Sequence, residues 1–221
     1  LFPSYEKVAK ALDGKVGETL AAEMQKKGVK PLIWVDYGFV QFGNNKLPLT
    51  KPEDFKGLKL RGYGELPSET IKALGAAPVS MGAGEVYMAL QRGTIDGQTS
   101  GTTAMFDRKM YEVTKYLTMT NHAFPEFVTA INLKAWNKLS ADQKKIIEEA
   151  AKEVQTAIRS EVKNEEDKAL KNLKDKGMQV HVVPAGELAA WQKATESVQA
   201  LFIKRTGEAG KQMVEFCKNL K

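Results

Sequence analysis

The longest stretch without proline or glycine limits the possible folds more than any other feature. It begins after Pro125 and ends before Gly177, and from the segment LSADQKKII onward apolar residues recur along it at helical spacing. Ser140 and Gln143 match the capping box that begins many helices. The pattern predicts a helix over about residues 140–176, which at 1.5 Å per residue is on the order of 50 Å long.

A helix of this length is longer than one small lobe is wide. One alternative is a coiled-coil arm, but the strict heptad repeat that such an arm requires is absent. The other is a strut that lies across two lobes of one molecule, and the sequence favours it. A chain of 221 residues is long enough for one large domain or two small ones.

Strand-like and helix-like segments alternate between residues 58 and 100. The segments, in order, are LKLR, a helix from about Pro67 to Leu74, APVSM, GEVYMALQRG and TIDGQ. This βαβαβ pattern predicts an α/β fold with a parallel sheet, in which APVSM is a buried strand. Upstream, VKPLIWVDYGFVQF is expected to form one long strand that bends near Gly38.

Charge and cysteine content narrow the possible functions. The 33 basic and 27 acidic residues give a net charge of +6, but Lys and Glu are interleaved, which is typical of solvated helix faces. We therefore expect no nucleic acid partner. No apolar run approaches the roughly 20 residues that span a membrane, so the chain is not expected to be membrane-embedded. Cys217 alone provides neither a disulfide nor a zinc site.

Catalytic motifs are scarce. The chain has no phosphate-binding G-x-x-x-x-G-K-[ST] loop and no H-E-x-x-H, and its two G-x-G segments lack the third glycine of a dinucleotide site. His122 is a candidate general base, but a polar group in a pocket wall is the favoured interpretation. Glu85 and Asp96 are interpreted as residues that tie a helix start and a turn. This shortage favours a binding protein over an enzyme.

Arg61 is different because its neighbours suit a ligand site. It ends the strand LKLR, and ligands of open α/β sheets bind outside the carboxyl ends of strands. The following GYG turn permits close approach of backbone, and the next helix start offers N–H groups to an anion. An arginine can hold a carboxylate through two hydrogen bonds. The local pattern leaves two interpretations open, a ligand anchor and, with more weight, an ordinary ion pair.

Several separate motifs occur in an order that strongly resembles the solute-binding subunits of TRAP transporters, the DctP-like family. They are KPEDFKGLKLR, IKALGAAPVSMGAGEVYMALQRGTIDGQ, KMYEVTKYL and INLKAWNKLSADQKKIIEEAAKE. The resemblance covers most of residues 1–175. It implies a periplasmic, non-enzymatic protein that binds a small organic acid between two lobes and delivers it to the membrane permease subunits.

The resemblance also implies a domain organisation. The fold would be a two-lobed, periplasmic-binding-protein-like α/β fold with mixed sheets, hinge strands and a long bridging helix. Residues 1–37 would be the remainder of the N-terminal lobe and residues 38–125 the second lobe. Residues 126–221 would cross back to the first lobe and supply the long helix, at about 140–176, and the C-terminal strand and helices. The opening LFPSYEKVAKALDG resembles entry after the family's first βαβ units, so about the first quarter and any signal peptide are expected to be missing.

In this family a carboxylate-gripping arginine ends the GLKxR motif, and that position is Arg61. Other positions depart from the family pattern. Ser100 stands where many members have a ligand-contacting asparagine, Ala83 where an aromatic residue is frequent, and Val40 or Gln41 where a second cation is expected. These departures favour a monocarboxylate with an apolar or aromatic body over a dicarboxylate or a sialic acid.

The complete set of expected ligand-binding residues is Arg61, Ser100, Gln98, Phe39, Ala83, Phe124, Phe127, His122 and Trp34. No catalytic residue, cofactor or metal site is expected, although a metal ion that bridges the ligand is left open. Two alternative functions also stay open. One is a small-molecule enzyme on the same frame that uses His122 or a carboxylate, and the other is a basic module that binds polyanions in a strongly salt-dependent way.

Overall fold

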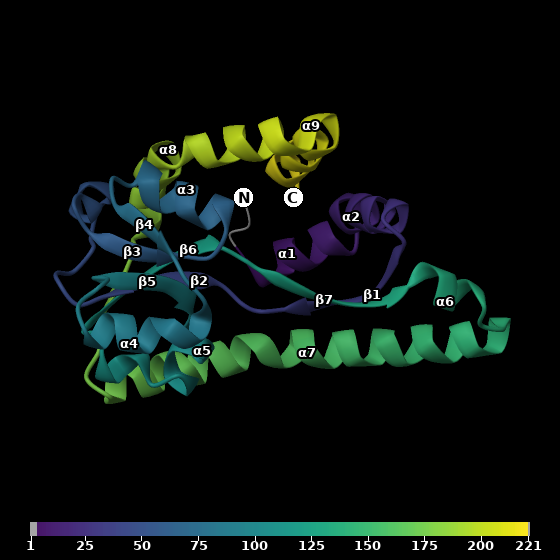
Figure 1. The fold of residues 1–221 in the computed structure, drawn as a ribbon, viewed down its shortest axis with the longest axis horizontal. Helices are drawn as coiled ribbons and strands as arrows, with labels where there is room; N and C mark the ends of the chain where they lie inside the picture. The colour runs from purple at the N-terminus through teal and green to yellow at the C-terminus, as the bar shows by residue number, and fades with distance from the viewer. Residues whose placement is uncertain (1–3, 221) are drawn as a thin grey trace. The chain divides into compact units, whose positions relative to one another are not determined.

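The computed structural model describes residues 4–220, which divide into two compact units (Figure 1). Of the described residues, unit 1 comprises 4–38, 124–165 and 207–220, and unit 2 comprises 39–123 and 166–206. Both units combine helices with strands, so the predicted α/β class is confirmed.

Unit 2 is built on a mixed sheet. Within the described residues this sheet has six strands in the order β4-β3-β5-β2-β6-β8. β3 runs parallel to β4 and β5, whereas β2 runs antiparallel to β5 and β6, and β6 runs parallel to β8. The strands are β2 (Val40–Asn44), β3 (Lys59–Gly62), β4 (Ala77–Ser80), β5 (Gly97–Gly101), β6 (Tyr116–Ala123) and β8 (Gln179–Val182). The β3-to-β5 portion is the predicted parallel βαβαβ segment.

Helices cover both faces of this sheet (Figure 1). One face packs on α3 (Glu65–Ala73), η1 (Pro52–Phe55) and α8 (Leu188–Ala194), through a core that includes Phe42, Phe55, Leu60, Ile71 and Trp191. The other face packs on α4 (Val86–Gln91), α5 (Thr102–Asp107) and the end of α7, through a core that includes Val86, Leu90, Met105, Leu117 and Leu173. Short 3-10 turns complete the unit: η2 (Ala83–Glu85), η3 (Met110–Glu112) and η4 (Ala185–Glu187).

Strand directions bring the ends of five strands, β3, β4, β5, β6 and β8, and the start of β2 to one edge of the sheet. The parallel strands β3, β5 and β6 all end there. Because β2 runs antiparallel to β5 and β6, it begins at the same edge, with Val40 opposite Gly101 and Ala123. We call this edge, formed by the ends of β3, β5 and β6 and the start of β2, the carboxyl edge.

Unit 1 contains a two-stranded antiparallel sheet among its described residues, formed by β1 (Val29–Asp36) and β7 (Glu126–Asn132). Its helices are α1 (Tyr5–Leu12), α2 (Lys15–Lys26), α6 (Leu133–Asn137), the first part of α7 and the last part of α9 (Glu196–Asn219). α2 packs on β1, and α6 packs on both strands. Gly207, at φ 65°, interrupts α9 where the chain passes from unit 2 to unit 1.

Two strand predictions were wrong. The segment VKPLIWVDYGFVQF forms two strands, β1 and β2, which belong to different sheets and are separated at Gly38, whose φ is +97°. The segment APVSM contains β4, which lies at the end of the strand order and pairs with β3. Its residues are exposed or partly buried, so β4 is an edge strand.

The long helix was predicted correctly. α7 (Ala141–Asp175) is 35 residues long. At its start the Ser140 N–H donates to Gln143 Oε1 at 2.9 Å, and the Gln143 N–H donates to Ser140 Oγ at 3.2 Å, which is the predicted capping box. Gly177 follows its end at φ +92°. Residues up to 165 belong to unit 1 and the remainder to unit 2.

Replacing Ser140 with alanine should lower the free energy of unfolding by about 1 kcal/mol, because one N–H at the start of the helix loses its acceptor. Urea unfolding followed by circular dichroism measures the change. Ser160→Ala is the matched control, since Ser160 lies inside the same helix and its hydroxyl donates to the Ala157 carbonyl. Equal destabilisation by both variants would contradict the capping role.

Candidate functional site

Arg61 lies at the carboxyl edge as the next-to-last residue of β3, and only 7% of it is exposed. Its Nε donates to the Met81 carbonyl at 3.2 Å, just beyond the end of β4. Its guanidinium carbon lies 5.0 Å from the centre of the Tyr63 ring, a cation–π distance. The arginine is therefore held by unit 2 beneath the surface, whereas an ordinary surface ion pair would leave it exposed.

Buried polar residues continue from Arg61 across the neighbouring strands. Gln98 on β5 is the register partner of Arg61, and Ser100, two residues further on, is the partner of Gln41 on β2. Residues that alternate by two, and their register partners, share one face of a sheet. We call Arg61, Gln98, Ser100 and Gln41 the polar row. Gln98, Ser100 and Gln41 are 2%, 5% and 1% exposed, and no described group bonds to Gln98 Nε2.

Gln41 is held by β6 and by its own strand. Its Oε1 accepts from the N–H groups of Thr120 and Asn121 at 2.8 and 2.9 Å. Its Nε2 donates to Asn121 Oδ1 at 2.6 Å and to the Phe39 carbonyl at 3.4 Å. Asn121 has a left-handed φ of 48°, so this amide fixes an unusual backbone at the edge. The second cation that the family pattern expects at position 40 or 41 is thus replaced by two buried, uncharged side chains, Val40 and Gln41.

His122 is partly buried and packs against the core. Its ring stacks on Phe42 with centroids 4.1 Å apart, and its Nδ1 lies 2.7 Å from Thr120 Oγ1. Burial lowers the pKa of His122 to about 3. A general base works best with a pKa near the operating pH, so this histidine is poorly suited to accept a proton at neutral pH.

The other expected site residues divide between the units. In unit 2, Phe39 is 4% exposed, and Ala83 lies in η2, two residues after the carbonyl that holds Arg61. Trp34, Phe124 and Phe127 belong to unit 1, where Phe127 is 62% exposed. Unit 2 thus gathers Arg61, Gln98 and Ser100 at one edge, while the aromatic walls from unit 1 stay predictions.

Two acidic residues have the structural roles that the sequence predicted. Glu85 Oε2 accepts from the Gly82 N–H at 2.7 Å and ties the start of its own helical turn. Asp96 Oδ2 accepts from the Lys59 N–H at 2.8 Å and so fixes the turn before β5. Across residues 4–220, no cluster of three or more His, Cys, Asp or Glu side chains could hold a metal ion.

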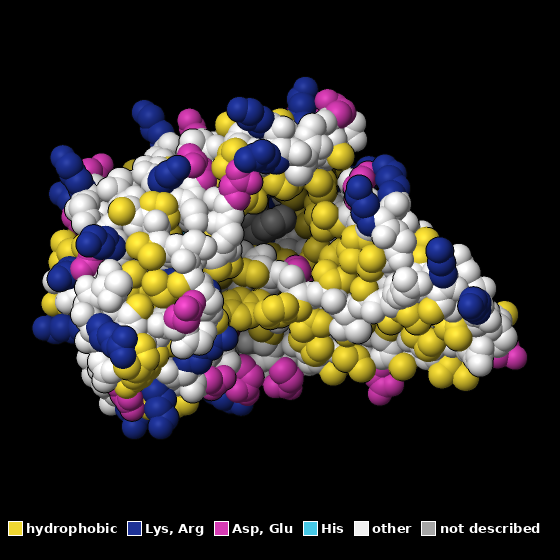
Figure 2. All heavy atoms as spheres, viewed as in Figure 1, with side chains coloured by type: hydrophobic (Ala, Val, Ile, Leu, Met, Phe, Trp, Pro, Cys, Tyr) yellow, Lys and Arg dark blue, Asp and Glu magenta, His cyan; other side chains and the backbone are white. Residues whose placement is uncertain are grey.

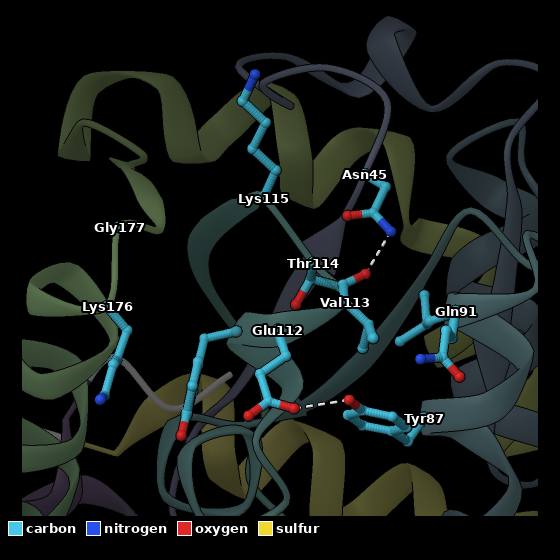
Figure 3. A pocket seen from close by; sticks show the side chains of 11 residues that line it. Asn45, Tyr87, Gln91, Glu112, Val113, Thr114, Lys115, Lys176 and Gly177 are labelled. Carbon is cyan, nitrogen blue, oxygen red and sulfur yellow. Dashed lines mark hydrogen bonds between the residues drawn. The ribbon is translucent and has the colours of Figure 1, made fainter.

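A cavity of about 440 Å³ lies at the opposite ends of β2 and β6, away from the carboxyl edge (Figure 3). The Tyr87 hydroxyl donates to Glu112 Oε2 at 2.6 Å, and the Asn45 side-chain amide donates to the Val113 carbonyl. Lys115 and Lys176 extend in different directions, so no pair of cations converges on one point. The remaining lining residues are Leu90, Gln91, Tyr111, Thr114 and Gly177. The cavity offers no anion anchor comparable to Arg61.

Unit 1 contains a buried carboxyl pair. Asp36 at the end of β1 is the register partner of Glu126 at the start of β7. Arg159 on α7 lies beside them, with its Nη1 2.7 Å from Asp13 Oδ2 and its Nε 3.6 Å from Asp36 Oδ1. Burial and the neighbouring Asp36 carboxylate raise the pKa of Glu126 to about 8, and burial also raises the pKa of Asp36. The Arg159 guanidinium therefore lies near the carboxyl groups of both Asp13 and Asp36. Because its pKa is about 8, Glu126 carries a proton at neutral pH.

The surface shows no strong charge segregation on the face drawn in Figure 2, where basic and acidic side chains are interspersed. Nor does any helix among the described residues combine the length and the apolar character that crossing a bilayer requires.

The fold and these residues define an α/β protein with a buried arginine at the carboxyl edge of its sheet, the usual place for ligands in such sheets. The chain belongs to the bacterial extracellular solute-binding protein family 7, DctP, whose family model matches residues 1–205. This membership confirms the resemblance that the sequence motifs indicated.

Characterised relatives are similar over most of the chain. It is 36% identical over 209 residues to the C4-dicarboxylate-binding periplasmic protein DctP of Rhodobacter capsulatus, a match that covers 94% of this chain and 62% of the relative. The TRAP periplasmic solute-binding protein of Sulfurospirillum deleyianum, solved with succinate, has a TM-score of 0.87 and 30% identity, covering all of this chain and 72% of that one. That of Roseobacter denitrificans, solved with β-D-glucuronate, has a TM-score of 0.92 and 28% identity over the same shares. The chain therefore spans less than two thirds of the length of its curated relative.

Proposed function

We propose that the protein is the extracytoplasmic solute-binding subunit of a TRAP transporter and captures a small organic acid at the carboxyl edge of unit 2. The observation that carries this proposal is the buried position of Arg61. A guanidinium held by the Met81 carbonyl and the Tyr63 ring is preorganised for a carboxylate, so little entropy is lost when the ligand binds.

The polar row would supply the remaining contacts. Gln98 Nε2 is a buried amide donor without a partner among the described groups, and it lies one strand from Arg61. A buried donor of this kind is costly unless a ligand or water accepts from it. Arg61 would neutralise the carboxylate, while Gln98 and Ser100 would donate to the same group or to a neighbouring oxygen.

The preferred ligand would carry one carboxylate. Arg61 is the cation of the polar row, and the position expected for a second cation holds Val40 and Gln41, whose amide already bonds to β6. A second carboxylate would be buried there without a counter-charge, which is strongly unfavourable. An apolar or aromatic body would suit Phe39, and Phe124, Phe127 and Trp34 are the candidate walls from unit 1.

The partners follow from family membership. Solute-binding subunits of TRAP transporters deliver their ligands to membrane permease subunits, so we infer such a partner and a periplasmic location. We also infer that the protein catalyses no reaction. The low pKa of His122 and the structural roles of Glu85 and Asp96 support this inference, because none of these three residues is suited to act as a general acid or base near neutral pH.

A thermal-shift screen tests the proposal. The complete gene product is used, because this chain spans only 62% of the length of a characterised relative. The panel contains benzoate and phenylacetate, succinate, and D-glucuronate, each with its neutral amide as control. Binding to the native state raises the melting temperature, and the shift grows with the logarithm of the ligand concentration divided by the dissociation constant.

We expect the carboxylates to stabilise the protein and the amides to have no effect, with benzoate or phenylacetate above succinate. Equal stabilisation by acids and amides would contradict carboxylate recognition. A larger shift with succinate would overturn the preference for one carboxylate but leave acid binding intact. Chemical turnover of a stabilising acid, followed by NMR, would contradict the inference that the protein is not an enzyme.

A further inference from the structure

Glu166 on α7 is attached to two of the chain segments that form the carboxyl edge. The Phe39 N–H, one residue before β2, donates to its carboxyl group. The Thr102 hydroxyl, one residue after β5, lies 3.5 Å from its backbone carbonyl oxygen, at the outer limit of a hydrogen bond. Glu166 therefore lies where β5 ends and β2 begins, close to Ser100 and Gln41 of the polar row.

One oxygen of this carboxyl group is unused. Glu166 Oε1 is buried and accepts no hydrogen bond from the described residues. The pKa of Glu166 is raised to about 7, mainly by burial and also by the Asp167 carboxylate, while the hydrogen bond from the Phe39 N–H lowers it. Protonated and ionised forms of Glu166 are therefore both present near neutral pH.

Other charged groups lie around this position. Arg61 stays cationic, and His122 stays neutral because its pKa is about 3. The ionisable neighbours of Glu166 on α7 are all exposed, and they are Lys163, Glu165, Asp167 and Lys168. Phe39 and Thr102, which contact Glu166 from the other elements, do not ionise. The pKa of Glu166, about 7, lies inside the range from pH 6 to 8.5.

We propose that Glu166 is a further residue of the acid-binding site, which favours an anionic ligand when its carboxyl group is neutral and disfavours it once ionised. This inference rests on the proposed function. It differs from a purely structural role, in which Glu166 would fasten α7 to the sheet without any effect on ligand affinity.

The size of the effect follows from geometry. A carboxylate held at Arg61 on β3 lies two strands from the start of β2, a separation of about 10 Å. At an effective dielectric constant of about 20, two like charges at that distance repel enough to change affinity on the order of ten-fold.

Isothermal titration calorimetry with benzoate, D-glucuronate and succinate at pH 6.0, 7.0 and 8.5 tests the inference on the complete gene product. Benzoate and D-glucuronate are essentially ionised over this range, so their own titration contributes little, whereas succinate is still partly protonated at pH 6.0 and serves only as a test of binding. We expect the dissociation constant of the wild type to increase on the order of ten-fold from pH 6.0 to 8.5. Glu166→Gln should bind at pH 8.5 as tightly as the wild type does at pH 6.0, with no dependence on pH.

Glu161→Gln is the matched control, because Glu161 is an exposed residue of the same helix. It should keep the pH dependence of the wild type. If a probe binds equally at every pH, or if Glu166→Gln keeps the wild-type pH profile, the role of Glu166 is wrong while acid binding stands. If none of the three probes binds at any pH, the proposed function itself fails, and the inference with it.

Discussion

Replacing Arg61 with alanine is expected to weaken the binding of carboxylate ligands by about 100-fold, or about 2.7 kcal/mol. The guanidinium is buried and held in place by the Met81 carbonyl, so its two hydrogen bonds to a carboxylate would form with little loss of entropy. Its removal also leaves the ligand charge buried without a counter-charge. Calorimetric titration with the tightest-binding acid of the thermal-shift panel measures the loss.

Two further variants separate charge from packing. Arg61→Met keeps an apolar side chain of similar length beside Tyr63, and it should lose binding as Arg61→Ala does while it retains the wild-type circular dichroism spectrum. Arg92→Ala removes an exposed positive charge from the same unit, and it should bind normally. Full affinity in Arg61→Met would show that Arg61 is not the anchor. Equal losses in Arg92→Ala would point to the overall charge of the unit.

Local sequence signals were sufficient to predict where the long helix begins and ends. Its start carries a capping box at Ser140 and Gln143, and its end carries Gly177 at positive φ. Both signals depend on neighbours a few residues away, and they placed the helix within a residue of α7 (Ala141–Asp175). The alternation between residues 58 and 100 identified β3, α3, β4, α4 and β5 for the same reason.

Strand partners could not be predicted in this way. β1 and β2 have continuous strand-like composition, but β1 pairs with β7 and β2 pairs with β5 and β6, all far along the chain. Composition reports how well a residue fits a pleated surface, and it does not report which strand lies beside it. The error for β4 has the same origin, because an apolar strand at the edge of a sheet has the same residues as one in its centre.

The candidate site was only partly accessible from sequence. The family resemblance, and not the local pattern, made Arg61 a candidate at the end of GLKxR and Ser100 a candidate after DGQ, and both remain predictions. The hydrogen bonds that join the Gln41 side chain to β6 depend on Asn121, which is 80 residues away in the sequence. No sequence pattern marked Glu166 as a residue of the site, because it lies within a run of charged residues that is typical of an exposed helix face. Its burial results from contacts with Phe39 and Thr102.

Replacing Glu126 with glutamine is expected to stabilise unit 1 at alkaline pH. The native pKa of Glu126 is about 8, above its usual value of 4.5, so the folded state binds more protons than the unfolded state between these values. Stability therefore falls as the pH rises through this window, and the loss is complete above pH 8. Ionised Glu126 would place a third carboxylate beside Arg159, which already faces Asp13 and Asp36.

Glutamine cannot ionise, so the variant should escape this loss. With a discount for solvent screening of a partly exposed group, we expect Glu126→Gln to protect β1 and β7 by about 2 kcal/mol more than the wild type at pH 9, and by less than about 0.5 kcal/mol at pH 5. Hydrogen exchange of peptides from β1 and β7, compared at the same pH, measures the local opening free energy. Glu153→Gln, at an exposed position of α7 in the same unit, should behave as the wild type at both pH values. Equal protection in the wild type and Glu126→Gln at pH 9 would mean that the Asp36 and Glu126 pair accommodates a second negative charge without cost.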